Sequence, residues 1–159
     1  MVALKTLVFS ILVPGTVTVI IPRLLLQGTG GLVLPALSLW IVGLLPLLIG
    51  VGLYIWCAGA FTFIGRGTPA PIDAPRVLVT QGAYRWMRNP RYVAVLIVVI
   101  GEAILFRSLL LAGYALLLLA VFHTFVVFVE EPSLRRQFGA SYEAYVHSIP
   151  RWLPHFPRG

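Results

Sequence analysis

The sequence predicts an all-α fold, a polytopic bundle of transmembrane helices that forms one membrane domain over residues 1–159. Hydrophobic residues make up 59% of the chain and charged residues only 11%, whereas a soluble domain carries about 25% charged residues. The apolar stretches are continuous instead of alternating at every second residue, which disfavours a transmembrane barrel. One of them, from Leu109 to Val129, is free of charge and long enough to cross a bilayer, since about 20 apolar residues span the hydrocarbon core.

Four apolar runs predict four main spans. The first runs from about Ala3 to Ile21 and lacks a small-residue cleavage site after it, so we expect a retained helix and not a signal peptide. The second, residues 32–64, is longer than one crossing needs and contains Pro46, which should kink it. The third starts at Pro90 or Tyr92 and ends near Phe106, and the fourth is the run that ends at Val129.

The distribution of basic residues predicts how the bundle is oriented. Most arginines lie between the second and third spans or in the C-terminal tail: Arg66, Arg76, Arg85, Arg88, Arg91, Arg135, Arg136, Arg151 and Arg158. The other two loops hold only Arg23 and Arg107. The positive-inside rule therefore places both termini and the middle segment in the cytoplasm. Topology and anionic lipids account for the net charge of +7, so we expect membrane lipids and no nucleic acid as partners.

The third loop is so short that spans three and four should form an antiparallel hairpin. This hairpin brings Asn89-Pro90, which is typical of a helix start, next to Glu130-Glu131 at the end of the fourth span. A helix start among arginines favours an anion, and two carboxylates favour a cation or hydroxyls. S-adenosylmethionine, which has a carboxylate, an ammonium, a sulfonium and a ribose diol, suits such a cavity. Alternatively, the arginines bind lipid phosphates and form salt bridges with the glutamates.

The segment after the two glutamates predicts a C-terminal amphipathic helix at the membrane interface. Leu134, Phe138, Tyr142 and Tyr145 recur at helical spacing and form an apolar stripe. Such a helix lies on the membrane or folds over the cytoplasmic mouth of the bundle, and a lid is one hypothesis for it. No cluster in the sequence has metal-ligand spacing, so no metal is expected.

The second half of the chain resembles the isoprenylcysteine carboxyl methyltransferase family, which is related to the phospholipid methyltransferases. The motifs that carry the resemblance are Leu78-Val79-Thr80-Gln81-Gly82-Ala83-Tyr84, Arg88-Asn89-Pro90-Arg91-Tyr92, and Glu130-Glu131 with Leu134, Phe138-Gly139, Tyr142 and Tyr145. The resemblance covers residues 76–154 and defines a cofactor-binding region there, whereas the N-terminal spans, residues 1–64, match only in character.

The resemblance implies an integral membrane enzyme that uses S-adenosylmethionine and binds it at the cytoplasmic face. The cofactor-binding residues that it implies are Leu78, Val79, Tyr84, Arg88, Asn89, Pro90, Tyr92, Glu130 and Glu131. Two positions depart from the family pattern. Asn89 stands where the family usually has histidine, and Val126 stands where the eukaryotic enzymes carry an arginine thought to meet the substrate carboxylate. These departures disfavour a prenylcysteine carboxylate as the acceptor. No residue is assigned as catalytic, and the acceptor atom is left open.

The function predicted is methyl transfer to a lipid-like or prenylcysteine-like hydrophobic acceptor that arrives from the bilayer. An NADPH-dependent membrane reductase of the steroid-reductase type is the alternative enzyme, since the arginines could bind its extra phosphate. A non-enzymatic membrane scaffold is the third possibility. The oligomeric state is left open by the sequence.

Overall fold

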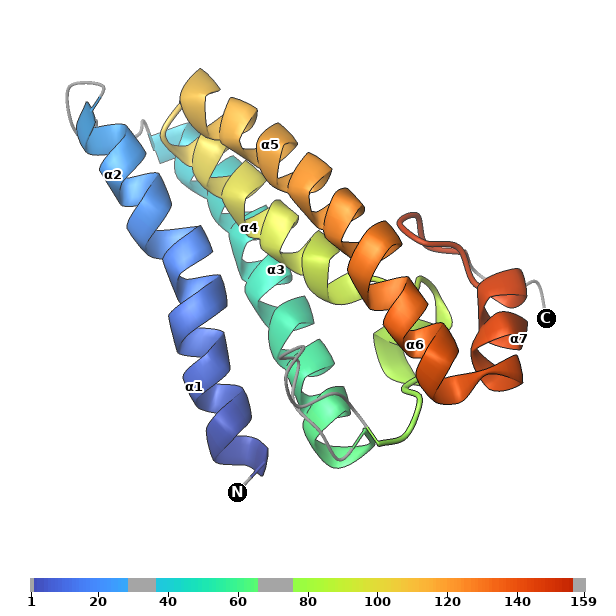
Figure 1. Ribbon diagram of the computed structural model, residues 1–159. Coiled ribbons are helices and arrows are strands. Elements are labelled where there is room, and N and C mark those ends of the chain that lie inside the picture. Colours follow the sequence, from blue (N-terminus) through green and yellow to red (C-terminus); the bar gives the residue numbers. More distant parts are fainter. Residues whose placement is uncertain (1, 29–36, 66–75, 156–159) are drawn as a thin grey trace.

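The computed structural model describes residues 2–28, 37–65 and 76–155 (Figure 1). Within these ranges the chain forms helices and no strand. The α-helices are α1 (Val2–Gly15), α2 (Ile21–Gly28), α3 (Leu37–Phe63), α4 (Pro90–Leu105), α5 (Leu109–Phe125), α6 (Glu131–Phe138) and α7 (Ala140–Ser148). Residues 32–36, Arg66 and Arg158, which entered the predicted spans and charge clusters, lie outside the described residues.

Three helical stretches are long and apolar enough to cross a membrane: Leu4–Gly28, Trp40–Phe63 and Leu109–Phe138. They correspond to the first, second and fourth predicted spans, and the first extends seven residues beyond its predicted end at Ile21. The third predicted span is α4, which has 16 residues and a length of about 24 Å at ~1.5 Å per residue. This is less than the ~30 Å of a hydrocarbon core, so a fourth crossing stays a prediction.

Helices α4 and α5 form the predicted antiparallel hairpin. Arg107, in a left-handed conformation with φ 49°, makes the turn between them, and the Ser108 side chain accepts a hydrogen bond from the Leu111 amide at 3.2 Å, which caps α5. Figure 1 shows the consequence at the other end of the hairpin. There the start of α4 lies with the end of α5 and with α6, at the same end of the bundle as the N-terminus.

The core of the bundle is the contact between α3 and α4, where small residues let the two backbones approach closely. A Cβ atom added at Gly50 would lie 2.7 Å from the Ala94 carbonyl oxygen, and one added at Gly101 would lie 2.8 Å from the Leu47 amide nitrogen. Small residues have this role wherever membrane helices pack without a hydrophobic driving force between them. Helix α4 is therefore held rigidly, and its first turn provides a fixed wall for the site described below.

The fourth span continues past the point where the sequence predicted its end. The chain stays helical from Leu109 through a π-helical turn at Val126–Glu130 and on to Phe138, so Glu130 and Glu131 lie within a helical rod and do not close it. The rod ends at Gly139, whose φ of +51° is one that glycine adopts readily. This break separates α6 from α7, so the segment predicted as one amphipathic helix is two short helices.

Candidate functional site: two cavities at the start of helix α4

The loop that precedes α4 is anchored on the end of α3 through Tyr84. Its ring is buried and meets Phe61 edge to face, with ring centroids 5.5 Å apart, and it shares a buried cluster with Cys57, Val79 and Ala83. Burial raises the pKa of the Tyr84 phenol well above its usual range, so the group stays protonated. The motif residues 78–84 are thus held by hydrophobic packing on the end of α3.

Two adjacent glutamates bind different residues at the start of α4, one just before the helix and the others in its first turn. Glu131 accepts a hydrogen bond from Arg88 Nη1 at 3.0 Å, whereas Glu130 accepts one from the Tyr92 hydroxyl at 2.6 Å and one from Arg91 Nη2 at 3.2 Å. Consecutive residues of a helix point in directions about 100° apart. The two side chains therefore diverge: Glu131 binds the segment before α4, and Glu130 binds the first turn of α4.

The Glu131 carboxylate, which is 4% exposed, lies among three guanidinium groups. Besides Arg88, it accepts hydrogen bonds from Arg151 Nε at 2.7 Å and Arg151 Nη2 at 3.1 Å, and Arg135 Nη1 lies 3.8 Å away. The hydrogen bond to Glu131 raises the pKa of Arg151 above its usual range. These interactions confirm the part of the alternative interpretation that paired the arginines with the glutamates.

The C-terminal segment folds over this cluster. The Tyr145 hydroxyl of α7 donates to the Tyr84 carbonyl oxygen at 2.6 Å. Beyond α7, the Pro150 carbonyl oxygen accepts from the Arg88 amide at 2.9 Å, and the Asn89 side chain donates to the Arg151 carbonyl oxygen at 3.2 Å. Asn89 stands at the N-cap position as predicted, but its side chain makes no capping bond to α4, because its amide binds the tail instead.

Two cavities flank the first turn of α4. The first, called here the polar cavity, has a volume of about 60 Å³, room for roughly two water molecules at ~30 Å³ each. Its lining residues are Phe61, Leu78, Val79, Tyr84, Arg88, Asn89, Glu130, Glu131, Leu134, Tyr142 and Tyr145. Seven of the nine residues predicted to bind a cofactor are among them. Pro90 and Tyr92 are not.

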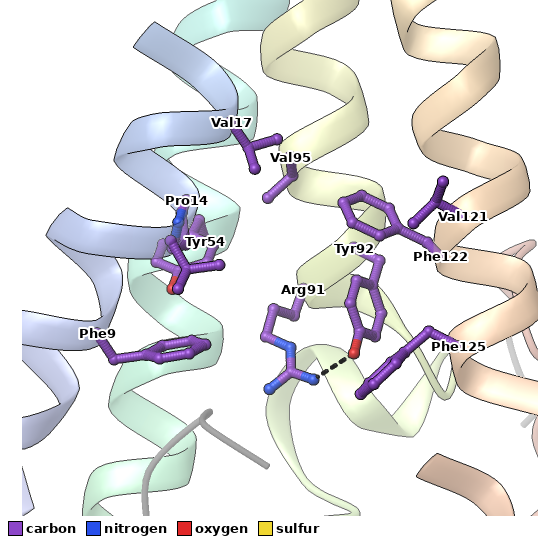
Figure 2. A pocket seen from close by; sticks show the side chains of 11 residues that line it. Phe9, Pro14, Val17, Tyr54, Arg91, Tyr92, Val95, Val121, Phe122 and Phe125 are labelled. Carbon is purple, nitrogen blue, oxygen red and sulfur yellow. Dashed lines mark hydrogen bonds between the residues drawn. The ribbon is translucent and has the colours of Figure 1, made fainter. Parts of the chain in front are cut away.

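The second, called here the apolar cavity, has a volume of about 360 Å³. It lies between α1, α3, α4 and α5 (Figure 2), and its lining residues are Phe9, Val13, Pro14, Val17, Tyr54, Arg91, Tyr92, Val95, Val121, Phe122 and Phe125. The two cavities meet at three side chains. Arg91 and Tyr92 face the apolar cavity, Glu130 faces the polar one, and their hydrogen bonds join the two walls.

Two polar atoms on residues that line the polar cavity have no hydrogen-bond partner among the described residues. They are the Tyr84 hydroxyl, apart from a weak interaction with the Cys57 thiol, and Arg88 Nε. Buried polar groups in proteins are nearly always paired, so these two atoms favour a polar ligand at this place. Among the described residues, no group of three or more histidine, cysteine or acidic side chains could hold a metal ion.

The predicted cofactor-binding residues leave out two contributors to the site. Arg91 was predicted only as one of the arginines around the helix start, because it occupies the variable position of its motif. Arg151 lies in the tail, twenty residues after Glu131, and only the folding back of the chain brings the two together. Tyr142 and Tyr145 were placed on the apolar stripe, and the structure puts both on the wall of the polar cavity.

The fold and the site together define a helical membrane protein with a polar and an apolar cavity on either side of one ion pair. The phospholipid methyltransferase family model matches residues 38–141, about two thirds of the chain, and the chain belongs to this family. The family contains the isoprenylcysteine carboxyl methyltransferases, so the resemblance found in the motifs is confirmed. No curated protein and no solved structure matches the chain. Membership indicates a membrane methyltransferase that acts on lipid-like substrates.

Proposed function

We propose that this protein is an S-adenosylmethionine-dependent methyltransferase of lipid-like acceptors, with the cofactor in the polar cavity and the acceptor in the apolar one. The observation that carries the proposal is the meeting of the two cavities at the Arg91, Tyr92 and Glu130 side chains. A methyl donor and a hydrophobic acceptor need adjoining sites of this contrast in polarity. The cofactor-binding residues proposed are the nine implied by the family motifs.

The residues of the polar cavity fit the cofactor by their chemistry. The Glu130 and Glu131 carboxylates favour its ammonium or its ribose hydroxyls, and the Tyr84 hydroxyl and Arg88 Nε are unsatisfied groups that it can pair. The free volume is far smaller than a nucleoside. Binding therefore requires the wall to open, and α7 is the part of the wall that closes over the cavity through the Tyr145 to Tyr84 hydrogen bond.

The chemistry that the cofactor supplies is an electrophilic methyl group: an acceptor lone pair forms the new bond, the carbon–sulfur bond breaks, and its electrons stay on sulfur. The protein's own contribution is positioning and exclusion of water. The helix α4 backbone is fixed by close packing on α3. Its first turn therefore keeps the positions of the two cavities constant relative to each other. The apolar lining keeps water from the acceptor side.

We further propose that the site faces the cytoplasm and that α4 completes a fourth crossing. At the end of the bundle that holds the site lie Arg85, Arg88, Arg91, Arg135, Arg136 and Arg151. Since lysine and arginine concentrate on the cytoplasmic side of membrane proteins, this end is the cytoplasmic one, with both termini on the same side.

Calorimetric titration of the purified protein with S-adenosylhomocysteine and, separately, with NADPH tests the proposed activity class. We expect S-adenosylhomocysteine to bind and NADPH not to bind. Glu130→Gln should weaken S-adenosylhomocysteine binding by about tenfold, because a charge-assisted hydrogen bond is worth roughly 1.5 kcal/mol or more. Glu143→Gln is the matched control, since Glu143 is half exposed and pairs with Arg135 outside the cavity. Binding of NADPH alone would refute the methyltransferase proposal.

A further inference from the structure

The apolar cavity ends on a single cation. Of its eleven lining residues, eight are wholly apolar, two are tyrosines and one is Arg91. Figure 2 shows Arg91 and Tyr92 next to each other at one end, with the guanidinium hydrogen-bonded to the Tyr92 hydroxyl at 2.8 Å. The Arg91 side chain is only 11% exposed, so a molecule in this cavity meets the charge with little water between.

The carboxylate that pairs with Arg91 lies on the wall of the other cavity. Glu130 is 3.2 Å from Arg91 Nη2, yet it lines the polar cavity and not the apolar one. The ion pair therefore presents its positive end to the apolar cavity and its negative end to the polar cavity. Because the Coulomb energy falls with distance, a charged group in the apolar cavity interacts more strongly with Arg91 than with Glu130.

The volume of the apolar cavity limits the size of the hydrophobic chain that a ligand can place in it. A volume of about 360 Å³ holds roughly twelve groups of the size of a water molecule, at ~30 Å³ each. One unbranched or isoprenoid chain of medium length fills that space. The wall of phenylalanine, valine and proline side chains offers such a chain dispersion contacts and no hydrogen bonds.

We infer that Arg91 is a specificity-determining residue that selects, for the apolar cavity, a single-chain amphiphile with an anionic head group and rejects one with an ammonium group. The inference deepens the proposed function and rests on it for the statement that this amphiphile is the methyl acceptor. An ammonium head in the apolar cavity would lie closer to the Arg91 guanidinium than to the Glu130 carboxylate, so the repulsion would be offset only in part. An anionic head would gain a charge-assisted hydrogen bond there.

Competition for a neutral photoreactive probe tests this selection. The protein, held in amphipol, is labelled with a diazirine-bearing dodecanol, and mass spectrometry locates the label. We expect label on residues of the apolar cavity, such as Phe122 or Val95. Dodecanoate should compete at about tenfold lower concentration than dodecylamine at neutral pH, as one charge-assisted contact predicts. Equal competition, or stronger competition by the amine, would overturn the inference.

Two substitutions of Arg91 and one control make the assignment specific. Arg91→Gln should abolish the preference for dodecanoate while the neutral probe still labels the cavity, and Arg91→Lys should preserve the sign of the preference. Arg85→Gln, at an exposed arginine that stacks on Trp86 and lines neither cavity, should leave the preference unchanged. A preference that survives in Arg91→Gln, or is lost in Arg91→Lys, would assign the selection to another residue.

The same preparation separates this inference from the proposed function. S-adenosylhomocysteine binding, measured by calorimetry on the parent protein, reports on the polar cavity alone. Its absence would refute the proposed activity and leave the charge selection of the apolar cavity standing. Intact S-adenosylhomocysteine binding together with equal competition by the two amphiphiles would refute the selection and leave the methyltransferase proposal standing.

Discussion

At the scale of single residues, the neighbouring glutamates Glu130 and Glu131 have different roles. Glu131 is almost fully buried and is surrounded by Arg88, Arg135 and Arg151, so it connects the segment before α4, helix α6 and the tail. Glu130 is 23% exposed, lines the polar cavity and pairs with Arg91, which lines the apolar one. Both glutamates line the polar cavity, but Glu131 lies among three arginines whereas Glu130 pairs with one.

This difference predicts unequal effects of removing each charge. Glu131→Gln should lower the free energy of unfolding by about 3 kcal/mol, because it leaves the buried Arg88 guanidinium without its carboxylate. Glu130→Gln should cost roughly half as much, since one arginine is affected instead of three. Thermal unfolding followed by circular dichroism measures both, with Glu143→Gln as the control expected to change little. Equal losses of unfolding free energy for Glu130→Gln and Glu131→Gln would contradict the assignment of different roles.

The unsatisfied hydroxyl of Tyr84 leads to a second prediction at this scale. Tyr84→Phe keeps the ring that packs on Phe61 and removes a buried hydroxyl whose one interaction among the described residues is the weak one with the Cys57 thiol. The free energy of unfolding should stay the same or rise by up to about 1 kcal/mol. Affinity for S-adenosylhomocysteine, measured by calorimetry, should fall by about fivefold, the equivalent of one neutral hydrogen bond. A marked loss of stability with unchanged binding would show that the hydroxyl serves the fold and not a ligand.

At the scale of secondary-structure elements, α4 is the reference on which the site is built. It supplies Arg91 and Tyr92 to one cavity, and Arg88 and Asn89 directly before it line the other. Its position depends on backbone contact with α3 at glycines. The π-helical turn Val126–Glu130 is the corresponding feature of the facing helix. Such turns occur often at functional sites, and this one ends on the glutamate that lines the polar cavity and pairs with Arg91.

Two glycines of α3 provide a matched test of that contact. Gly50→Ala would place a methyl group 2.7 Å from the Ala94 carbonyl oxygen and should destabilise the protein by about 1–3 kcal/mol, as overpacking does. Gly52→Ala meets nothing within 4 Å, and alanine favours a helix over glycine, so it should be neutral or stabilise by up to about 1 kcal/mol. Both are measured by thermal unfolding. Equal effects would show that α3 and α4 are free to separate.

At the scale of the whole molecule, the bundle concentrates basic side chains at one end. That end holds the site, the N-terminus and the tail (Figure 1). Arg23, which was predicted in the first loop, lies within α2, and Arg107 lies in the turn between α4 and α5. The chain has one cysteine, Cys57, which is buried, so a single introduced thiol can report on topology without interference. The membrane orientation is thus accessible to direct chemical measurement.

Labelling with a membrane-impermeant maleimide tests the proposed orientation. Arg136→Cys, on the exposed surface of α6, should be labelled only in inverted vesicles, where the cytoplasmic face is outside. Arg107→Cys, in the turn between α4 and α5, should be labelled only in right-side-out vesicles if α4 completes a crossing. Labelling of both positions from the same side would exclude the fourth crossing, and a reversed pattern would place the site outside the cytoplasm.

Much of this architecture follows from local chemistry alone. Long continuous apolar runs are stable only in lipid, where the backbone forms its hydrogen bonds within a helix. The helices and their approximate positions are therefore evident from the sequence. The short connection at Arg107 and Ser108 permits only an antiparallel neighbour, so the meeting of Asn89-Pro90 with Glu130-Glu131 is also evident. The family motifs add the residues that now line the polar cavity, with Pro90 and Tyr92 as the two exceptions.

The tertiary structure alone decided what each charge does. Whether a helix ends or continues at a glutamate depends on how the helix packs against its neighbours. The local sequence therefore did not predict that the helix continues through Glu131 to Phe138. The pairing of Arg151 with Glu131 depends on a tail that folds back through backbone hydrogen bonds to Trp86 and Arg88. Likewise, Arg91 faces one cavity and its carboxylate the other because two helices meet there. The sequence specifies which charged groups are present, but the packing of the helices determines which cavity each group faces.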